Sequence, residues 1–298
     1  MSSTQYRHVV WESPELVAYL HPRPWTPGSV ILEQRVPGGP GASVFQLGEP
    51  EYLSMLLGAR TVGSLLCDTL GIRLLPLHGL DAEWRPHLAA EEEHSPFDPG
   101  FCTSKSGPRW SDGRLAEIQA KVRTRLPSPD APPDFTFLGD DPGHPGLFSR
   151  IVRGEETQWR VWEDRGHVAF LTPFPNAPGF TVVVPRRPLT SDIFRLERGD
   201  YEDLALATRQ VAVLLGKGLG AAGVGLIFEG FEIDYAHAKV IPLLSPPPAA
   251  SVGERDPPSS DPSPARFHTT YPGFVSSEDG PEASLETLKE FQNQITRL

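Results

Sequence analysis

The chain of 298 residues repeats itself, and this repeat restricts the possible folds more than any other feature of the sequence. Val10-Trp11-Glu12 is followed by Val17-Ala18-Tyr19-Leu20 and a Pro- and Gly-containing segment that ends at Gly28. The same order returns at a constant offset of 151 positions, from Val161 to Gly179. In each copy an apolar run typical of a strand follows, at 30–32 and 182–184, and then a stretch with helical periodicity. Two copies of one folding unit are therefore expected.

The helical stretches and the ends of the copies also correspond. Each helix is predicted to end at a glycine, Gly71 or Gly220, where a left-handed C-cap favours that residue. A third block closes each copy: Pro99-Gly100-Phe101 through Leu115 in the first, and Pro272-Gly273-Phe274 through Leu288 in the second. We expect an α+β protein of two tandem units, each an antiparallel sheet with a long helix.

Two segments interrupt the repeat. Residues 126–146, rich in Pro, Gly and Asp, are predicted to be a linker, so the expected domains are 1–125 and 147–298. Residues 244–265 contain Pro246-Pro247-Pro248 and further Pro and Ser residues, and we expect this insert to be disordered.

Composition excludes several classes of function. A formal net charge of −11 argues against a general binder of nucleic acid or of an anionic membrane. The first residues show no signal-peptide pattern, and no apolar run approaches a membrane-spanning length, so we expect a cytoplasmic protein. Cys67 and Cys102 form no CxxC motif, and the run Glu91-Glu92-Glu93-His94 lacks metal-ligand spacing, so we expect neither a metal nor a cofactor.

The two copies differ after the helix. Five positions separate Gly71 from Pro76, whereas twenty-two separate Gly220 from Pro242, and the extra residues are predicted to form two strands joined by a turn. In the second of these strands Tyr235, His237 and Lys239 alternate with small residues and share one face. A phenol, an imidazole and an ammonium on one face can hold and attack a phosphoryl group, with His237 as the nucleophile. An amphipathic strand whose polar face meets water has the same spacing, so the pattern alone leaves both interpretations open.

The second half resembles the histidine triad (HIT) superfamily in the order of its motifs, from residue 147 to residue 243. These motifs are Leu147 to Glu155, Val161-Trp162-Glu163-Asp164, Ala169 to Gly179, Val182 to Pro185, and the segment from Gly230 to Pro242. The resemblance implies a nucleotidyl-histidine formed on the middle residue of a His-x-His-x-His motif. Tyr235 takes the first position, His237 the middle one and Lys239 the third.

The resemblance also implies a nucleotide pocket, for which the candidate residues are Phe170, Thr172, Asn176 and Gly230. Thr172 stands where many members have an Asp for the ribose hydroxyls, and Phe231 stands where they often have a Gln near the phosphate. The first half resembles the family more faintly. It is expected to be a degenerate copy that has lost the nucleophile strand, and pairing His87 with His237 is the rival alignment.

The expected function is that of a HIT-type nucleotide hydrolase or nucleotidyl transferase, acting through His237 on a nucleoside phosphate ester, anhydride or phosphoramidate. The alternative is a catalytically inactive HIT-like protein that binds a nucleotide or serves as a scaffold. Since HIT proteins commonly dimerise, we expect either a homodimer or a pseudo-dimer within one chain. A neutral imidazole is required, so activity should fall as His237 is protonated.

Overall fold

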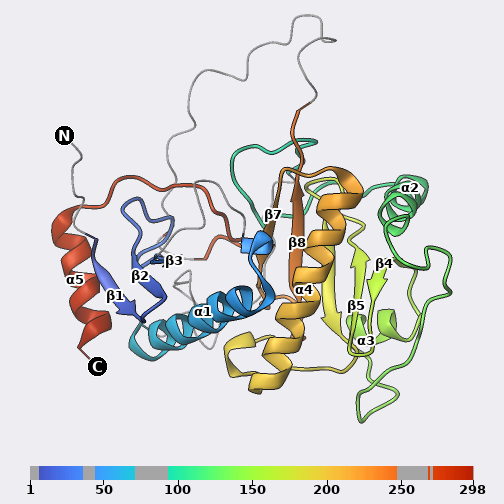
Figure 1. Cartoon of the computed structure of the whole chain (residues 1–298), viewed down its shortest axis with the longest axis horizontal. Helices are drawn as coiled ribbons and strands as arrows, with labels where there is room; N and C mark the ends of the chain where they lie inside the picture. Colours follow the sequence, from blue (N-terminus) through green and yellow to red (C-terminus); the bar gives the residue numbers. More distant parts are fainter. Residues whose placement is uncertain (1–6, 36–43, 71–92, 247–267, 269–270, 298) are drawn as a thin grey trace, which may run out of the picture.

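The computed structural model describes residues 7–35, 44–70, 93–246, 268 and 271–297. Within them the chain forms two antiparallel sheets, each with a long helix, and the predicted α+β class with two tandem units is confirmed (Figure 1).

The first unit contains a sheet of three described strands in the order β1-β2-β3. These are β1 (Val9–Glu12), β2 (Leu16–Leu20) and β3 (Val30–Gln34). A short 3-10 helix, η1 (Val44–Gln46), and the long helix α1 (Glu49–Leu70) follow.

The second unit contains a five-stranded sheet in the order β4-β5-β6-β8-β7. Its strands are β4 (Trp159–Glu163), β5 (His167–Leu171), β6 (Thr181–Pro185), β7 (Gly223–Ile227) and β8 (Ala238–Leu243). The short helix α3 (Leu147–Val152) precedes them, and η2 (Ile193–Arg195) and the long helix α4 (Arg198–Leu219) connect β6 to β7. As predicted, α4 ends at Gly220 in the left-handed conformation, with φ of 71°.

The repeat extends to irregular features of the backbone. The pairing of β1 with β2 shifts register between Val9 and Trp11, and the pairing of β4 with β5 shifts between Arg160 and Trp162, which are the matching positions. Because a bulge adds a residue to one strand of a pair, the same local bend occurs in both units.

Helices α1 and α4 pack against each other and join the two units. Arg60 in α1 donates hydrogen bonds to the carbonyl oxygens of Phe194 and Leu196. Its counterpart Arg209 in α4 donates to the carbonyl oxygen of Leu47, with 2.6 Å between donor and acceptor. The two units are therefore related by an approximate two-fold arrangement within one chain.

The C-terminal helices of the two copies are exchanged between the units. Helix α2 (Asp112–Arg123) follows the first copy in sequence but packs on β4 and α4 of the second unit. Helix α5 (Leu285–Thr296) ends the second copy but packs on β1 and α1, and Figure 1 shows it at the far side of the molecule from α2. By sequence α2 belongs to the first copy, and by packing it belongs to the second unit.

The segments that lead to these two helices meet on the way. Thr103 and Ser276, equivalent in the repeat, form an antiparallel bridge. Gly107 N–H donates to the carbonyl oxygen of Phe174, and Gly280 N–H donates to that of Arg23, each with an N–O distance of 3.0 Å. We call residues 103–107 and 276–280 the first and second crossing tails.

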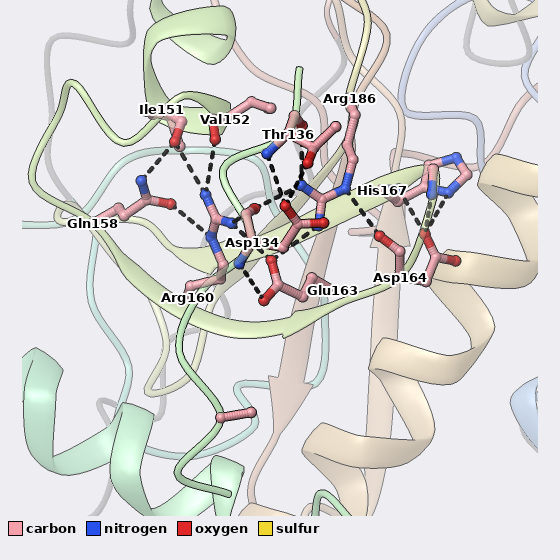
Figure 2. Close-up of polar contacts among 12 residues, drawn as sticks. Asp134, Thr136, Ile151, Val152, Gln158, Arg160, Glu163, Asp164, His167 and Arg186 are labelled. Carbon is pink, nitrogen blue, oxygen red and sulfur yellow. Dashed lines mark hydrogen bonds and ion pairs between the residues drawn. The ribbon is translucent and has the colours of Figure 1, made fainter. Parts of the chain in front are cut away.

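The predicted linker 126–146 is fixed to the second unit by two buried arginines (Figure 2). Arg160 and Arg186 both donate to the carbonyl oxygen of Asp134, and Arg186 also donates to that of Thr136. Glu163 accepts from both guanidinium groups. From its place beside Arg187 after a strand, Arg186 is expected to be a solvated surface charge or to attract phosphates. Both expectations are wrong because only 1% of it is exposed and backbone carbonyls surround it.

Several sequence predictions fall outside the described residues. These are the C-cap at Gly71, the residues His78 and His87, the loss of the nucleophile strand from the first copy, and the disordered insert from residue 247 onward. No helix of the described residues is long and apolar enough to cross a membrane.

Candidate active site

The two strands predicted between Gly220 and Pro242 are present as β7 and β8, which pair antiparallel. Ala236, Ala238 and Val240 lie in the core beneath α4, whereas Tyr235 and Ile241 belong to the core on the opposite face of the sheet. The predicted alternation is therefore confirmed, but β8 begins only at Ala238. Pro185 ends the partner strand β6 and has no N–H with which to extend the pairing, so residues 235–237 lie before the strand.

His237 is buried at the start of β8, with 6% of it exposed. Its Nδ1 lies 2.8 Å from the carbonyl oxygen of Tyr235. A carbonyl oxygen only accepts, so Nδ1 carries the proton of the neutral ring and the Nε2 lone pair is available. The edge of the Phe148 ring packs against the imidazole, with 5.2 Å between centroids, and fixes its orientation.

Burial lowers the pKa of His237 to about 4, and Lys239 adds to this effect. Desolvation disfavours the charged imidazolium, so the neutral form dominates at pH 7. The acid loss of activity expected from the sequence is thereby moved well below the ordinary titration range of histidine.

Lys239 forms an ion pair in which its Nζ lies 2.7 Å from Oε2 of Glu229. The side chains are only 15% and 6% exposed. Tyr271, from the segment before the second crossing tail, donates its hydroxyl to Oε1 of the same carboxylate. The ammonium of Lys239 is thus already neutralised at the place where the sequence predicts a phosphate contact.

Tyr235 lies in the core and not in the cavity around His237. Its hydroxyl donates to the carbonyl oxygen of Pro185 at 2.9 Å, and its ring packs edge-on against Phe148. Burial raises the pKa of this phenol. In this arrangement Tyr235 supports Phe148 and presents its backbone carbonyl to His237.

His237 and Lys239 line a cavity of about 390 Å³, which we call the His237 cavity. Its apolar walls come from α3 and from the face of the sheet opposite α4, and include Leu147, Phe148, Ile151, Trp159, Phe170, Phe180 and Val182. Thr172, Glu229 and Glu232 also line it, as do Ser104 and Ser106 from the first crossing tail. Of the predicted nucleotide residues, the structure places Phe170 and Thr172 here together with His237 and Lys239.

The other two predicted nucleotide residues do not line this cavity. Asn176 is buried and donates from Nδ2 to the carbonyl oxygens of Thr103 and Lys105, at 2.8 and 2.7 Å. Gly230 packs so closely on Ser191 that an added Cβ would lie 2.3 Å from the Cβ of that serine. Asn176 thus holds the first crossing tail, and Gly230 allows the β7–β8 connection to approach the loop before η2.

Sequence reasoning missed Glu229 and the two serines of the first crossing tail. Glu229 precedes the predicted motif and lies ten positions from Lys239. Ser104 and Ser106 stand in the block that matches Ser277 and Asp279, so the repeat marked the block without showing which unit it touches. No group of His, Cys, Asp and Glu within the described residues could hold a metal ion.

Comparison with known proteins gives consistent relatives. A HIT-like protein of Saccharolobus solfataricus is 28% identical over 107 residues, which is 34% of this chain and 76% of that protein. A HIT-like protein of Mycoplasma genitalium is 26% identical over 101 residues, covering 32% of this chain and 71% of the relative. A solved structure described as a hypothetical histidine triad nucleotide-binding protein of Sulfolobus tokodaii is 21% identical and has a TM-score of 0.31, covering 50% of this chain and 88% of that one. No protein-family model matches the chain.

The fold and site define an α+β protein of two tandem units, with a buried neutral histidine in a cavity of the second unit. The chain belongs to the HIT-like superfamily, and matches that each cover about a third of its length fit one unit of a two-unit protein.

Proposed function

We propose that the chain binds a nucleotide or nucleotide conjugate in the His237 cavity and transfers its nucleotidyl group through a covalent bond to His237. The observation that carries this proposal is the neutral imidazole, whose Nδ1 is held by the Tyr235 carbonyl while the side chain lines the cavity. Such a ring is an activated nucleophile at neutral pH.

The chemistry proceeds in two steps. The Nε2 lone pair of His237 attacks the α-phosphorus, an N–P bond forms, and the bond from phosphorus to the leaving group breaks with its electron pair on that group. The leaving group then takes a proton. In the second step water or another acceptor attacks phosphorus, the N–P bond breaks, and the pair returns to Nε2. When water is the acceptor, its oxygen stays on phosphorus and a proton is released.

The remaining walls of the cavity suit the base of a nucleotide. Phe148, Phe170 and Phe180 provide aromatic surface, and Leu147 and Phe174 on the lining are 40% and 45% exposed. Flat apolar surfaces favour a nucleobase because stacking removes its faces from water.

The alternative function is nucleotide binding without turnover, and one observation favours it. Lys239 is paired with Glu229, and Tyr235 donates to Pro185, so neither faces a phosphate in this structure. Stabilising the transition state would require Lys239 to exchange Glu229 for phosphate oxygens.

Intact-protein mass spectrometry distinguishes the two functions. After incubation with AMP esters, dinucleoside polyphosphates and UDP-sugars, the native chain is expected to gain one nucleotidyl mass or to release product. The His237→Asn variant is expected to show neither, a loss of at least about 1,000-fold in turnover. Nucleotide binding by both proteins with no adduct and no product would replace the enzyme with the binding function. No binding by the native chain would contradict both.

The pH dependence gives a second prediction. Because the pKa of His237 is lowered to about 4, kcat/KM for a nucleoside phosphodiester should stay level from pH 8 to about 5.5 and fall about tenfold per pH unit below 4. The phosphodiester is chosen because it does not titrate in this range. A midpoint near 6.5 would contradict the buried, neutral state of His237.

The control for this profile is circular dichroism at each pH. The unfolded chain has an ordinary histidine pKa near 6.5, above the folded value, so protonation favours unfolding as the pH falls from 6.5 to 4. Only a loss of rate with an unchanged spectrum reports on the nucleophile.

A further inference from the structure

The His237 cavity is not built by the second copy alone. Ser104 and Ser106 line it, and both come from the first crossing tail, which is part of the first copy in sequence. The counterpart on the other side, residues 276–280, lies on the loop of the first unit around Arg23 and contributes no residue to this cavity. The approximate two-fold arrangement therefore holds for the tails, but only one tail faces the nucleophile.

The first crossing tail is held in place by several bonds. Asn176 donates to the carbonyl oxygens of Thr103 and Lys105, and so clamps the backbone on either side of Ser104. Gly107 N–H and Trp110 N–H donate to the carbonyl oxygens of Phe174 and Pro173, at 3.0 and 2.9 Å. Because these acceptors belong to the loop that begins at Thr172, the tail and the loop form one rigid wall.

This wall carries hydroxyl groups and no charge on its cavity side. Ser106 is exposed, and no hydrogen bond of its hydroxyl is found within the described residues. The Thr172 hydroxyl accepts a hydrogen bond from the N–H of Phe174, so its proton stays free to donate. Uncharged hydroxyl groups of this kind pair well with the hydroxyls of a sugar, each of which both donates and accepts.

We infer that the first crossing tail forms the sugar subsite of the His237 cavity, with Ser106 and Thr172 bonding the ribose hydroxyls and Asn176 positioning the tail. This inference rests on the proposed function and names the part of the substrate that the first copy recognises. The degenerate copy then supplies specificity to the site that holds the nucleophile.

The chain offers a matched pair of variants to test this. A Cβ at Gly107 would lie 2.1 Å from the carbonyl oxygen of Pro175, and one at Gly280 would lie 1.9 Å from that of Pro24. Since both clashes are with backbone, Gly107→Ala and Gly280→Ala each displace one tail by a comparable strain. Only the first displaces the tail that lines the His237 cavity.

The measurement is the ratio of affinities, by isothermal titration calorimetry, for AMP, GMP and UMP and for their 2′-deoxy counterparts. The native chain is expected to prefer the ribonucleotide by about 3 to 10-fold, the range of one or two neutral hydrogen bonds. Gly107→Ala should reduce this ratio to about one, and Gly280→Ala should leave it unchanged. Ser106→Ala, at an exposed position that folding does not depend on, should reduce it in part.

Each outcome separates the inference from the function on which it rests. If Gly107→Ala does not fold, Asn176→Ala removes the two bonds to the tail without a clash, and the same loss of the ratio is expected. A native ratio of one, a ratio that survives Gly107→Ala and Ser106→Ala, or equal loss in Gly280→Ala overturns the sugar subsite. Failure of the native chain to bind any of the nucleotides overturns the proposed function itself.

Discussion

Replacing Glu163 by alanine is expected to lower the free energy of unfolding by about 3–5 kcal/mol, the range for removing one partner from a buried ion pair. Oε2 of Glu163 accepts from Arg160 at 2.7 Å and from Arg186 at 3.0 Å (Figure 2). Both guanidinium groups are 1% exposed, and within the described residues the one other carboxylate near them is Asp134, which is largely exposed. Without Glu163, two like charges remain buried side by side, and chemical denaturation measures the loss.

A surface ion pair provides the control. Arg198 and Glu202 form an exposed pair one helical turn apart in α4, and Glu202→Ala is expected to cost less than about 1 kcal/mol. Glu163→Gln keeps an acceptor oxygen and should cost less than the alanine variant. A cost for Glu163→Ala as small as that for Glu202→Ala would show that carbonyl oxygens alone hold the two arginines.

The sequence predicts the units well because each repeated block carries its own local signal. Strand periodicity, the proline-rich turn and the serine before α2 and α5 all appear twice, and Ser111 and Ser284 both cap their helices as N-cap residues. The exchange of α2 and α5 could not be predicted in this way. Similarity between blocks shows which elements correspond, whereas packing on the other unit depends on distant contacts such as Gly107 with Phe174.

The site was predictable only as far as alternation reaches. The spacing of His237 with small neighbours indicates a side chain that faces away from the helix, and the structure has it so. The fate of Tyr235 and Lys239 depends on partners that no short motif connects to them. Pro185 accepts from Tyr235 across the sheet, and Glu229 approaches Lys239 from the other end of the β7–β8 connection.

Lys239→Gln is expected to weaken nucleotide binding by about 100-fold or more, because it leaves the Glu229 carboxylate buried and uncompensated in the cavity that receives the phosphate. Tyr271 would still donate to one oxygen of that carboxylate, but a neutral hydroxyl does not cancel its charge. Glu232 on the same cavity adds to the repulsion of an anionic ligand. Calorimetric titration with AMP, GMP and UMP measures the change.

The double variant Lys239→Gln/Glu229→Gln separates lost attraction from new repulsion. It removes both charges and keeps hydrogen-bonding groups at both positions, so binding should recover to within about tenfold of the native chain. Recovery of this size means that the native pair is close to neutral toward the phosphate and that Lys239 acts mainly by cancelling Glu229. If the double variant binds as weakly as Lys239→Gln, the ammonium leaves Glu229 and contacts the phosphate directly, which is the exchange that turnover at His237 requires. Native affinity in both variants would place the phosphate away from Lys239 and contradict its assignment to the site.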